Sequence, residues 1–137
     1  MHTIALLEPA VNIEHVAFNV ADPVAVADWY ARHLGLRVVR KGDGPVFGHF
    51  LADSAGRTVL EIYHQDAPVP DYPNLHPFVF HIAFMCEDVA GERARLLAAG
   101  ATPAGEVTTS ANGDVMTFLR DPWGVVLQLV RRGTPLL

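Results

Sequence analysis

Short runs of apolar residues recur along this chain in two matching series. The run at 13–20 is rich in β-branched and aromatic residues, which is typical of a strand, and the run at 78–86 repeats its His-x-Ala-Phe motif. The repeated histidine lies 66 residues further along (81 − 15), and FLADSAG at 50–56 recurs as FLRDPWG at 118–124. The chain is therefore one module present twice, and internal repeats of this kind determine the architecture.

The first copy of the module predicts a strand, a helix and three more strands. Asp22 is a suitable N-cap and Pro23 a suitable first helical residue, so the helix is expected to begin there and to end at Leu34, before a glycine. Trp29 and Tyr30 recur at helical spacing with other apolar residues, which predicts that they belong to the core. The strands that follow are expected at 36–41, 45–52 and 57–65.

The second copy predicts the same order of elements after its strand at 78–86. Its helix is expected over 88–99, with Gly100 as the stop signal. An Asn-Gly pair within 111–114 predicts a tight hairpin turn. The remaining strands are expected at 103–109, 115–119 and 125–131.

Proline marks the boundary between the two copies. Four prolines fall between Gln65 and Pro77, and such a segment continues neither a helix nor a sheet. We therefore expect a single domain over 1–137. Its parts are a first βαβββ module at 13–66, a linker at 67–77 and a second βαβββ module at 78–132.

Length and charge then limit the classes of function. The chain has 137 residues, half of them apolar, which is enough for one core but too little for two independent ones. Its formal net charge is −5 and it contains no run of Lys and Arg, which argues against a nucleic-acid partner. No segment approaches the roughly 20 apolar residues of a membrane span, so no membrane partner is expected.

The single cysteine, Cys86, lies in an apolar strand and is expected to be a core residue rather than a catalytic thiol. A lone cysteine forms no intrachain disulfide, which favours a reducing compartment. The first residues lack the features of a secretory signal peptide. We therefore expect a soluble, cytoplasmic protein.

Strand parity shows where polar side chains interrupt the apolar pattern, because alternate residues of a strand point to opposite faces. The first and fourth strands of each copy carry one apolar row that should face the helices. A polar residue with metal-binding capability interrupts the opposite face in every case. These residues are His15, Glu61, His81 and Gln128. They occupy two equivalent positions in two equivalent modules.

Two imidazoles and a carboxylate are a common ligand set for Zn, Ni, Mn, Co or Fe(II), and the amide oxygen of Gln128 is a weaker, neutral ligand. A carboxylate such as Glu61 is costly to bury unless it is paired or bound to metal. The alternative is that the other three are satisfied core residues and that Glu61 points to solvent. The duplicated register favours one bound divalent metal ion, with positions left open for water or substrate.

Further motifs add a resemblance to a known family. They are the His-x-Ala-Phe openings, the DP…WY…LG pattern of the helix at 22–35 and the DPWG turn at 121–124. With the paired modules, these resemble the vicinal oxygen chelate superfamily over about 13–132. It includes glyoxalase I, methylmalonyl-CoA epimerase, extradiol dioxygenases, thiol-transferase antibiotic-resistance enzymes and bleomycin-resistance proteins. The resemblance implies an α+β fold in which two tandem βαβββ modules form a curved, partly open mixed sheet around a central cleft, with helices outside.

The resemblance also implies roles for the four polar residues. Metal ligands of the superfamily lie on the first and fourth strands of each module, which here means His15, Glu61, His81 and Gln128. Three of these match, whereas metal-dependent members usually carry a glutamate where this chain has Gln128. An amide takes up no proton at neutral pH, so the catalytic base is expected to be Glu61 or a metal-bound hydroxide.

The function that this resemblance implies is that of a metal-dependent, glyoxalase-like lyase or isomerase. It would act on a small molecule with two neighbouring oxygens through metal-stabilised enediolate chemistry. A non-catalytic small-molecule binding module, comparable to bleomycin-resistance proteins, is the alternative; the retained His15, Glu61 and His81 favour the enzyme. An Fe(II)-dependent dioxygenase is a distant alternative, since its carboxylate ligand would fall at Gln128.

Other residues are candidates for the lining of a substrate pocket. They are His49, Tyr63, His64, Tyr72 and Met116. The expected partner is a small-molecule substrate of unidentified structure. By resemblance we also expect a homodimer, in which the two modules either pair within a chain or exchange between two chains.

Overall fold

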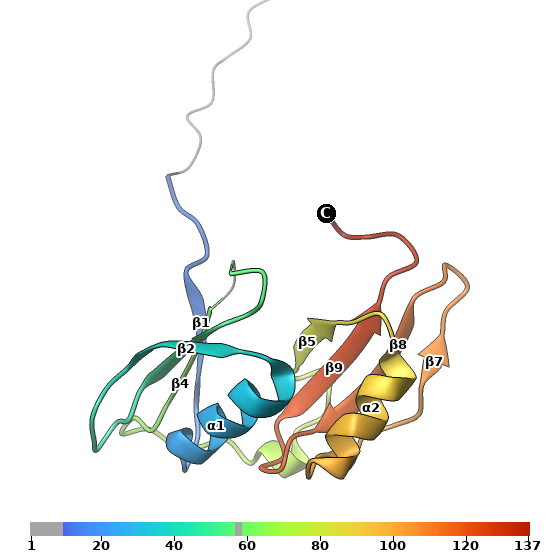
Figure 1. Ribbon diagram of the computed structural model, residues 1–137. Helices are drawn as coiled ribbons and strands as arrows, with labels where there is room; N and C mark the ends of the chain where they lie inside the picture. Colours follow the sequence, from blue (N-terminus) through green and yellow to red (C-terminus); the bar gives the residue numbers. More distant parts are fainter. Residues whose placement is uncertain (1–9, 57–58) are drawn as a thin grey trace, which may run out of the picture. The chain divides into compact units, whose positions relative to one another are not determined.

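The computed structural model describes residues 10–56 and 59–137 (Figure 1). The first two residues of the strand expected at 57–65 lie outside the described residues. The chain divides into two compact units, Met1–Pro68 and Val69–Leu137, and each has its own sheet and helix. In the described part of the chain, no helix is long and apolar enough to cross a membrane.

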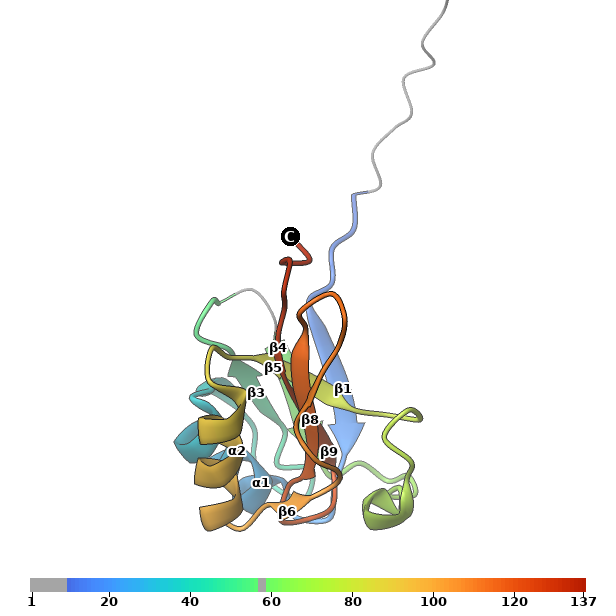
Figure 2. The ribbon, with the colours of Figure 1, turned by 90° about the vertical axis from the view of Figure 1, so that its right-hand side faces the viewer.

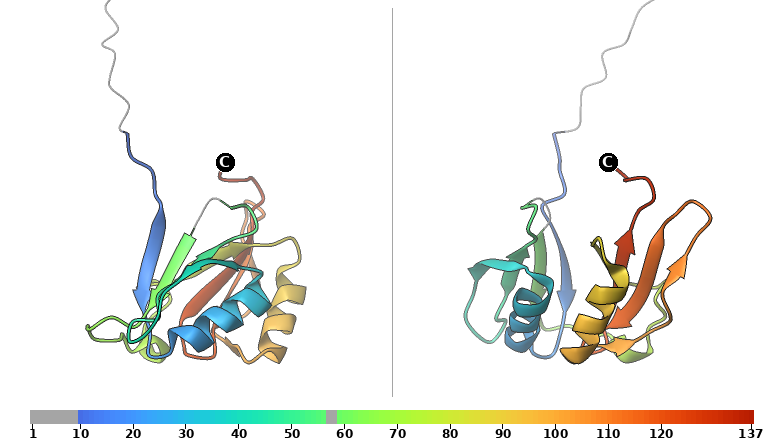
Figure 3. Two further views of the ribbon diagram at one scale, coloured as in Figure 1. Left: turned by 60° about the vertical axis from the view of Figure 1, so that its left-hand side comes forward. Right: turned by 45° about the vertical axis from the view of Figure 1, so that its right-hand side comes forward.

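The first unit contains one helix packed on a four-stranded sheet. Its elements are β1 (His15–Asn19), α1 (Pro23–Leu34), β2 (Arg37–Lys41), β3 (His49–Ala52) and β4 (Val59–Tyr63). The strand order is β1-β4-β3-β2, with β1 parallel to β4 and the other two pairs antiparallel. Helix α1 covers one face of this sheet (Figure 3).

Helix α1 begins and ends at the residues that its capping signals predict. The Asp22 side chain accepts a hydrogen bond from the Ala25 N–H at 3.1 Å, and Gly35 ends the helix with a left-handed φ of 68°. Trp29 and Tyr30 are buried, with exposed fractions of 7% and 0%. Their predicted role in the core is confirmed.

The third strand of this unit is shorter than predicted. The sequence suggests a strand over 45–52, but β3 begins only at His49. Phe47 has a φ of 46°, outside the extended region, and the Gly42 N–H donates to the Gly48 carbonyl at 2.8 Å. Residues 42–48 therefore form a closed loop between β2 and β3.

The second unit repeats this architecture. Its elements are a 3₁₀ turn η1 (Tyr72–Asn74), β5 (Ile82–Met85), α2 (Val89–Ala98), β6 (Thr102–Pro103), β7 (Thr108–Thr109), β8 (Val115–Arg120) and β9 (Val126–Arg131). The strand order is β5-β9-β8-β6, β7 also pairs with β8, and β5 is parallel to β9. Figure 2 shows α2 beside the sheet of β8 and β9. The predicted α+β class, with two βαβββ modules and open mixed sheets, is confirmed.

The strand predicted at 103–109 is broken into two short pieces. Both β6 and β7 pair with β8, but Gly105 between them has a φ of 130°, a conformation that ordinary strand residues avoid. The carbonyl of Glu106 instead accepts a hydrogen bond from the Thr117 hydroxyl at 3.3 Å. The chain stays beside β8 without forming a continuous ladder.

The end of the linker is fixed to the second unit by Arg120. Its guanidinium donates to the carbonyls of Tyr72 and Leu75, both at 2.9 Å, and to that of Gly124 at 3.2 Å. The buried Asp121 accepts hydrogen bonds from two backbone N–H groups of the turn that follows β8. The DPWG turn is therefore a structural element that holds the linker against the end of β8.

Asp114 links the hairpin at 111–114 to the C-terminal segment and leads to a pH-dependent prediction. The Gly133 N–H donates to its Oδ1 atom at 2.9 Å, and Arg132 donates to Oδ2 at 3.0 Å. The Gly133 bond first, and the Arg132 bond and charge with it, hold the pKa of Asp114 below its ordinary value.

Asp114→Asn is therefore expected to lower the thermal midpoint by a few degrees at pH 7. A depressed native-state pKa stabilises the fold above the unfolded-state pKa, which for Asp is about 3.9, and this contribution disappears as the pH falls through the native value. The difference between the two proteins should therefore shrink towards pH 3 in thermal melts. Asp66→Asn, at an exposed position, serves as the control. A difference that stays constant from pH 7 to pH 3 would contradict the assignment.

Candidate functional site

The sheet of the first unit has one buried and one half-buried face. Along β4, exposure alternates: Leu60 and Ile62 are buried, whereas Glu61 and Tyr63 are intermediate. The buried pair lies on the side that α1 covers. The parity predicted for this strand is confirmed, and Glu61 lies on the face away from the helix.

His15 and Glu61 meet on that half-buried face. Strands β1 and β4 are parallel neighbours, with Ala17 opposite Glu61 and His15 opposite Val59, so both polar side chains project from the same face. His15 Nε2 lies 3.4 Å from Glu61 Oε1, and their side chains are 33% and 19% exposed. Glu61 therefore does not point freely to solvent, and its partner is an imidazole.

Phe50 completes this arrangement from β3. It is directly opposite Glu61 in the antiparallel pairing of β3 and β4. The rings of His15 and Phe50 meet edge to face, with centroids 5.5 Å apart and an interplanar angle of 83°. Phe50 restricts the orientation of the imidazole beside the carboxylate. His15, Phe50 and Glu61 form the first cluster.

The hydrogen bonds of the His15 ring limit what can lie between its Nε2 atom and Glu61. Its Nδ1 atom lies 2.9 Å from a carboxylate oxygen of Glu14, which accepts the N–H of the tautomer that carries its proton on Nδ1. In the neutral ring, Nε2 then presents a lone pair to a second acceptor, Glu61 Oε1. A metal ion between these two atoms would satisfy both acceptors.

The distance fits a metal ion. Ligand bonds of about 2.1 Å in a tetrahedral arrangement separate two donor atoms by about 3.4 Å. The observed distance from Nε2 to Oε1 is 3.4 Å. Where a histidine binds a metal, a carboxylate often accepts a hydrogen bond from its other ring nitrogen, and Glu14 lies at that position relative to His15.

The second unit has an equivalent arrangement. His81 Nδ1 lies 2.8 Å from the Pro77 carbonyl, which only accepts, so Nδ1 donates and Nε2 keeps its lone pair. The His81 ring meets Phe118 edge to face at 5.2 Å and 76°. Phe118 lies directly opposite Gln128 in the pairing of β8 and β9. His81, Phe118 and Gln128 form the second cluster.

Gln128 differs from Glu61 in burial and in hydrogen bonding. Its exposed fraction is only 7%, and its amide Nε2 donates to Met116 Sδ at 3.4 Å. The bond to sulfur uses the nitrogen and leaves the carbonyl Oε1 of the amide as a neutral donor atom for a cation. The second cluster therefore offers an imidazole and an amide oxygen, whereas the first offers an imidazole and a carboxylate.

Neither cluster is a full metal site by itself. Among the described residues, no group of three or more His, Cys, Asp and Glu side chains lies close enough to hold a metal ion. Each cluster contributes two donor atoms, so water, substrate or further protein ligands are needed to complete a coordination sphere.

Phe50 and Phe118 were not among the predicted site residues, although the sequence contained the signal. They open the repeated segments FLADSAG and FLRDPWG, which in the sequence alone indicate the duplication. The structure places each phenylalanine against the histidine of its own unit. The repeated segments therefore supply the phenylalanine that holds each imidazole, in addition to the strands of the fold.

Two of the five predicted pocket residues lie beside the clusters. Tyr63 follows Glu61 by two positions in β4 and so shares its face. Met116 contacts Gln128 through its sulfur. Both remain candidates for contact with a ligand at these positions.

The structure does not bring the other three pocket residues to either cluster. His49 pairs with Ile62, so its side chain lies on the helix-covered face of the first sheet. His64 is bonded through Nδ1 to the Val20 carbonyl at 2.8 Å. Tyr72 is buried in the second unit, with its ring 6.4 Å from that of Phe80.

Cys86 is not an activated thiol. Burial, followed by the charges of Glu92 and Asp88, raises its pKa above the ordinary value. The thiol therefore stays protonated at neutral pH and is a poor nucleophile. Cys86 is only partly buried and follows the last residue of β5, so it is not the core strand residue that the sequence predicts.

Comparison with known proteins adds independent information. Residues 12–129 match the family model of the Glyoxalase/Bleomycin resistance protein/Dioxygenase superfamily. Comparison with curated protein sequences gave no significant match. The resemblance predicted from the repeated motifs is confirmed at the level of the superfamily.

Several solved structures share the fold. The protein SMU.1112c is 28% identical, with a TM-score of 0.70, over 89% of this chain and 99% of that chain. TnmS3, an antibiotic binding protein from Streptomyces sp. CB03234, is 18% identical, with a TM-score of 0.69, over 92% and 99%. A glyoxalase I mutant from Zea mays is 23% identical, with a TM-score of 0.68, over 86% of this chain and 44% of its own.

Proposed function

We propose that this chain, which belongs to the glyoxalase/bleomycin resistance protein/dioxygenase superfamily, is a metal-dependent lyase or isomerase of the glyoxalase-like class. The observation that carries the proposal is the His15–Glu61 pair, in which two acceptor atoms 3.4 Å apart share a half-buried sheet face. The substrate class is a small molecule with two neighbouring oxygens.

The proposed metal ligands come from both clusters. They are His15, Glu61, His81 and Gln128, with one divalent ion (Zn, Ni, Co, Mn or Fe) per ligand set. The free Nε2 atoms of both histidines and the free amide oxygen of Gln128 support this assignment. When bound, such an ion polarises substrate oxygens as a Lewis acid.

The residues of the chain supply positioning and proton transfer. Glu61 is the proposed base, because an amide at the equivalent position, Gln128, takes up no proton at neutral pH. Its Oε1 atom faces His15, which leaves Oε2 to receive a proton from a substrate carbon and return it to a neighbouring one. Phe50 and Phe118 are positioning residues that hold the two imidazole rings.

Elemental analysis tests the proposal directly. Protein purified without a metal-affinity tag is expected to carry one divalent ion per ligand set, and the His15→Ala/His81→Ala variant is expected to carry none. His76→Ala, which removes a histidine outside both clusters, is the control and should retain the ion. The proposal fails if the unmodified protein holds no divalent metal and gains no thermal stability from Zn, Ni, Co or Mn.

Gln128→Glu is expected to tighten metal binding about tenfold, because it adds an anionic ligand to a cationic site. The same change should destabilise the metal-free protein, since a carboxylate at this buried position is costly unless it is paired or bound to metal. Isothermal titration with Zn²⁺ and thermal melts in chelator measure the two effects. Unchanged affinity would remove Gln128 from the proposed ligands.

A second candidate function is small-molecule binding without catalysis. The neutral Gln128 favours it, because the second cluster lacks the carboxylate that could serve as a further base. TnmS3, which shares the fold, is an antibiotic binding protein. Ligand binding that is unaffected by chelator and by Glu61→Gln would support this candidate over the enzyme.

We also propose that the chain forms a homodimer, as its resemblance to the superfamily implies. Sedimentation velocity of the metal-loaded protein is expected to give twice the monomer mass. If the protein is monomeric at all concentrations, each set of metal ligands must come from a single chain.

A further inference from the structure

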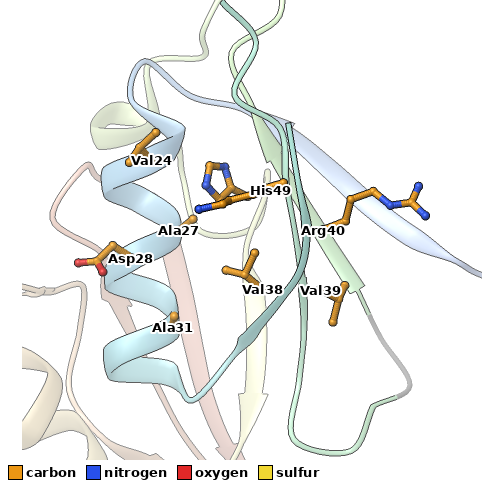
Figure 4. Close-up of a pocket in the computed structure, with 9 residues that line it drawn as sticks. Val24, Ala27, Asp28, Ala31, Val38, Val39, Arg40 and His49 are labelled. Atoms are coloured by element: carbon orange, nitrogen blue, oxygen red, sulfur yellow. The ribbon is translucent and has the colours of Figure 1, made fainter. Parts of the chain in front are cut away.

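A groove runs along the helix-covered side of the first sheet, on the face opposite the first cluster (Figure 4). Its volume is about 570 Å³. One wall is α1 and the other is formed by β2 and β3. The lining residues that face each other across it are Val24, Ala27 and Ala31 of α1, Val38 and Lys41 of β2, and His49 of β3. We refer to it as the α1–β2 groove.

The groove is open because β2 does not pack closely on the helix. The register of β2 against β3 shifts between Val38 and Arg40, which inserts an extra residue and bends the strand. Every residue of β2 is exposed, and Val38 and Val24 keep exposed fractions of 38% and 50% on opposite walls. Two apolar surfaces therefore face a space that no described side chain fills.

His49 places a polar atom inside this apolar space. The side chain is only 7% exposed, and Figure 4 shows its ring directed between β3 and α1. Its Nδ1 atom donates to the Phe47 carbonyl at 2.7 Å. Within the described chain, Nε2 has no hydrogen-bond partner, so the groove presents a fixed imidazole nitrogen to any occupant.

Lys41 gives the same end of the groove a positive charge. It pairs with His49 in the antiparallel register, so both side chains lie on the helix side of the sheet. It is the single lysine of the chain and makes no ion pair within the described residues. The acidic residue of the lining, Asp28, is already paired with Arg32 at 2.9 Å. The Arg40 guanidinium lies over the Phe50 ring, on the opposite face.

We infer that the α1–β2 groove binds a small aliphatic carboxylate. The aliphatic chain lies against Val24, Ala31 and Val38, and the carboxylate meets the Lys41 ammonium. His49 Nε2 lies at the same end of the groove, where its lone pair accepts a hydrogen bond from a water that also donates to the carboxylate. This site goes beyond the proposed function, because a sheet separates it from the first cluster and it needs no metal ion.

The lone lysine allows a selective test. Reductive methylation with ¹³C-formaldehyde keeps the charge of Lys41 and labels it, with the chain's amino terminus as the other reactive amine. In chelator-treated protein, hexanoate is expected to shift the dimethyl-Lys41 signal in a saturable manner. Amide signals of Val24, Ala31 and His49 should shift with the same midpoint. The uncharged probe 1-hexanol should bind more weakly and leave the Lys41 signal in place.

Matched variants then separate the groove from general electrostatics. Lys41→Gln is expected to weaken hexanoate binding about fivefold, the effect of losing one partly exposed ion pair. Arg37→Gln removes the same charge from the same strand outside the groove and should leave the affinity unchanged. His49→Leu should also weaken binding, but His49 is buried, so the exposed Lys41 carries the test if that variant does not fold.

Three results would overturn the inference. Equal weakening by Lys41→Gln and Arg37→Gln would indicate non-specific attraction of an anion. Shifts of the groove signals on concentrating the protein alone would indicate that a second copy occupies this face. Shifts confined to residues near Glu61 would place hexanoate at the first cluster. Since chelator-treated protein is used, failure of the metal proposal would leave the expected hexanoate result unchanged.

Discussion

Glu61→Gln is expected to weaken divalent metal binding at least about 100-fold. Loss of a residue that only hydrogen-bonds to a metal ligand typically costs 10–100-fold, and Glu61 is itself a proposed ligand. The change keeps the shape of the side chain but removes the one carboxylate of the proposed ligand set. It also removes the proposed base, so any turnover of a substrate should fall below detection. Competition with a fluorescent zinc indicator measures the affinity, and thermal melts with and without Zn²⁺ measure the linked stability.

The controls for this prediction form a graded series. Glu14→Gln leaves both first-cluster donors in place and alters only the partner of His15 Nδ1. A loss of about tenfold, the lower end of that range, is expected because the Glu14 side chain is 86% exposed. Glu106→Gln, at a side chain that is 90% exposed, should have no effect. In chelator, Glu61→Gln should be as stable as the unmodified protein. If the variant loses as much stability without metal as with it, Glu61 has a structural role instead.

Local sequence patterns account for most of what the sequence could predict. Period-two alternation placed Glu61 on the face away from α1, and the alternating exposure of β4 agrees with it. Capping residues placed both ends of α1. These features depend on local chemistry and on burial of one face, which adjacent residues in the chain encode.

Two of the features that were missed are local backbone conformations, and a third depends on contacts between distant residues. The interruption at Gly105 is visible only as a left-handed backbone angle, and the short β3 follows from the conformation of Phe47. The attachment of Tyr72 and Leu75 to Arg120 joins residues more than forty positions apart. The position of His49 could have been predicted. It lies two residues before Leu51 in β3 and therefore shares its face, on the helix side of the sheet.

The two clusters also show how duplication and divergence combine. Each keeps a histidine held edge to face by a phenylalanine, but one carries a carboxylate and the other an amide. A divalent ion held by one carboxylate and neutral ligands retains a net positive charge. Such a site attracts an anionic or readily ionised substrate oxygen, whereas Gln128→Glu would cancel that charge. The tighter metal binding expected of that variant should therefore come with weaker binding of an anionic substrate.

Arg120→Met is expected to lower the free energy of unfolding by about 3 kcal/mol, since hydrogen bonds to a charged group contribute about 1.5–3 kcal/mol each when lost. Methionine keeps the aliphatic packing but leaves the carbonyls of Tyr72, Leu75 and Gly124 without their donor. For a chain of this length the loss corresponds to a drop of about 10 °C in the thermal midpoint. Urea denaturation followed by circular dichroism gives the free energy directly.

A second readout distinguishes a local role for Arg120 from general weakening of the second unit. Because its bonds fix the 3₁₀ turn at Tyr72–Asn74, the variant should be cut by a broad-specificity protease within the segment 65–77 well below its melting temperature. Arg131→Met, at the exposed end of β9, removes the same charge without touching the linker and should change neither stability nor cleavage. Equal protection of the linker in all three proteins would mean that Arg120 stabilises the sheet alone, and that the turn is held by its own backbone bonds and prolines.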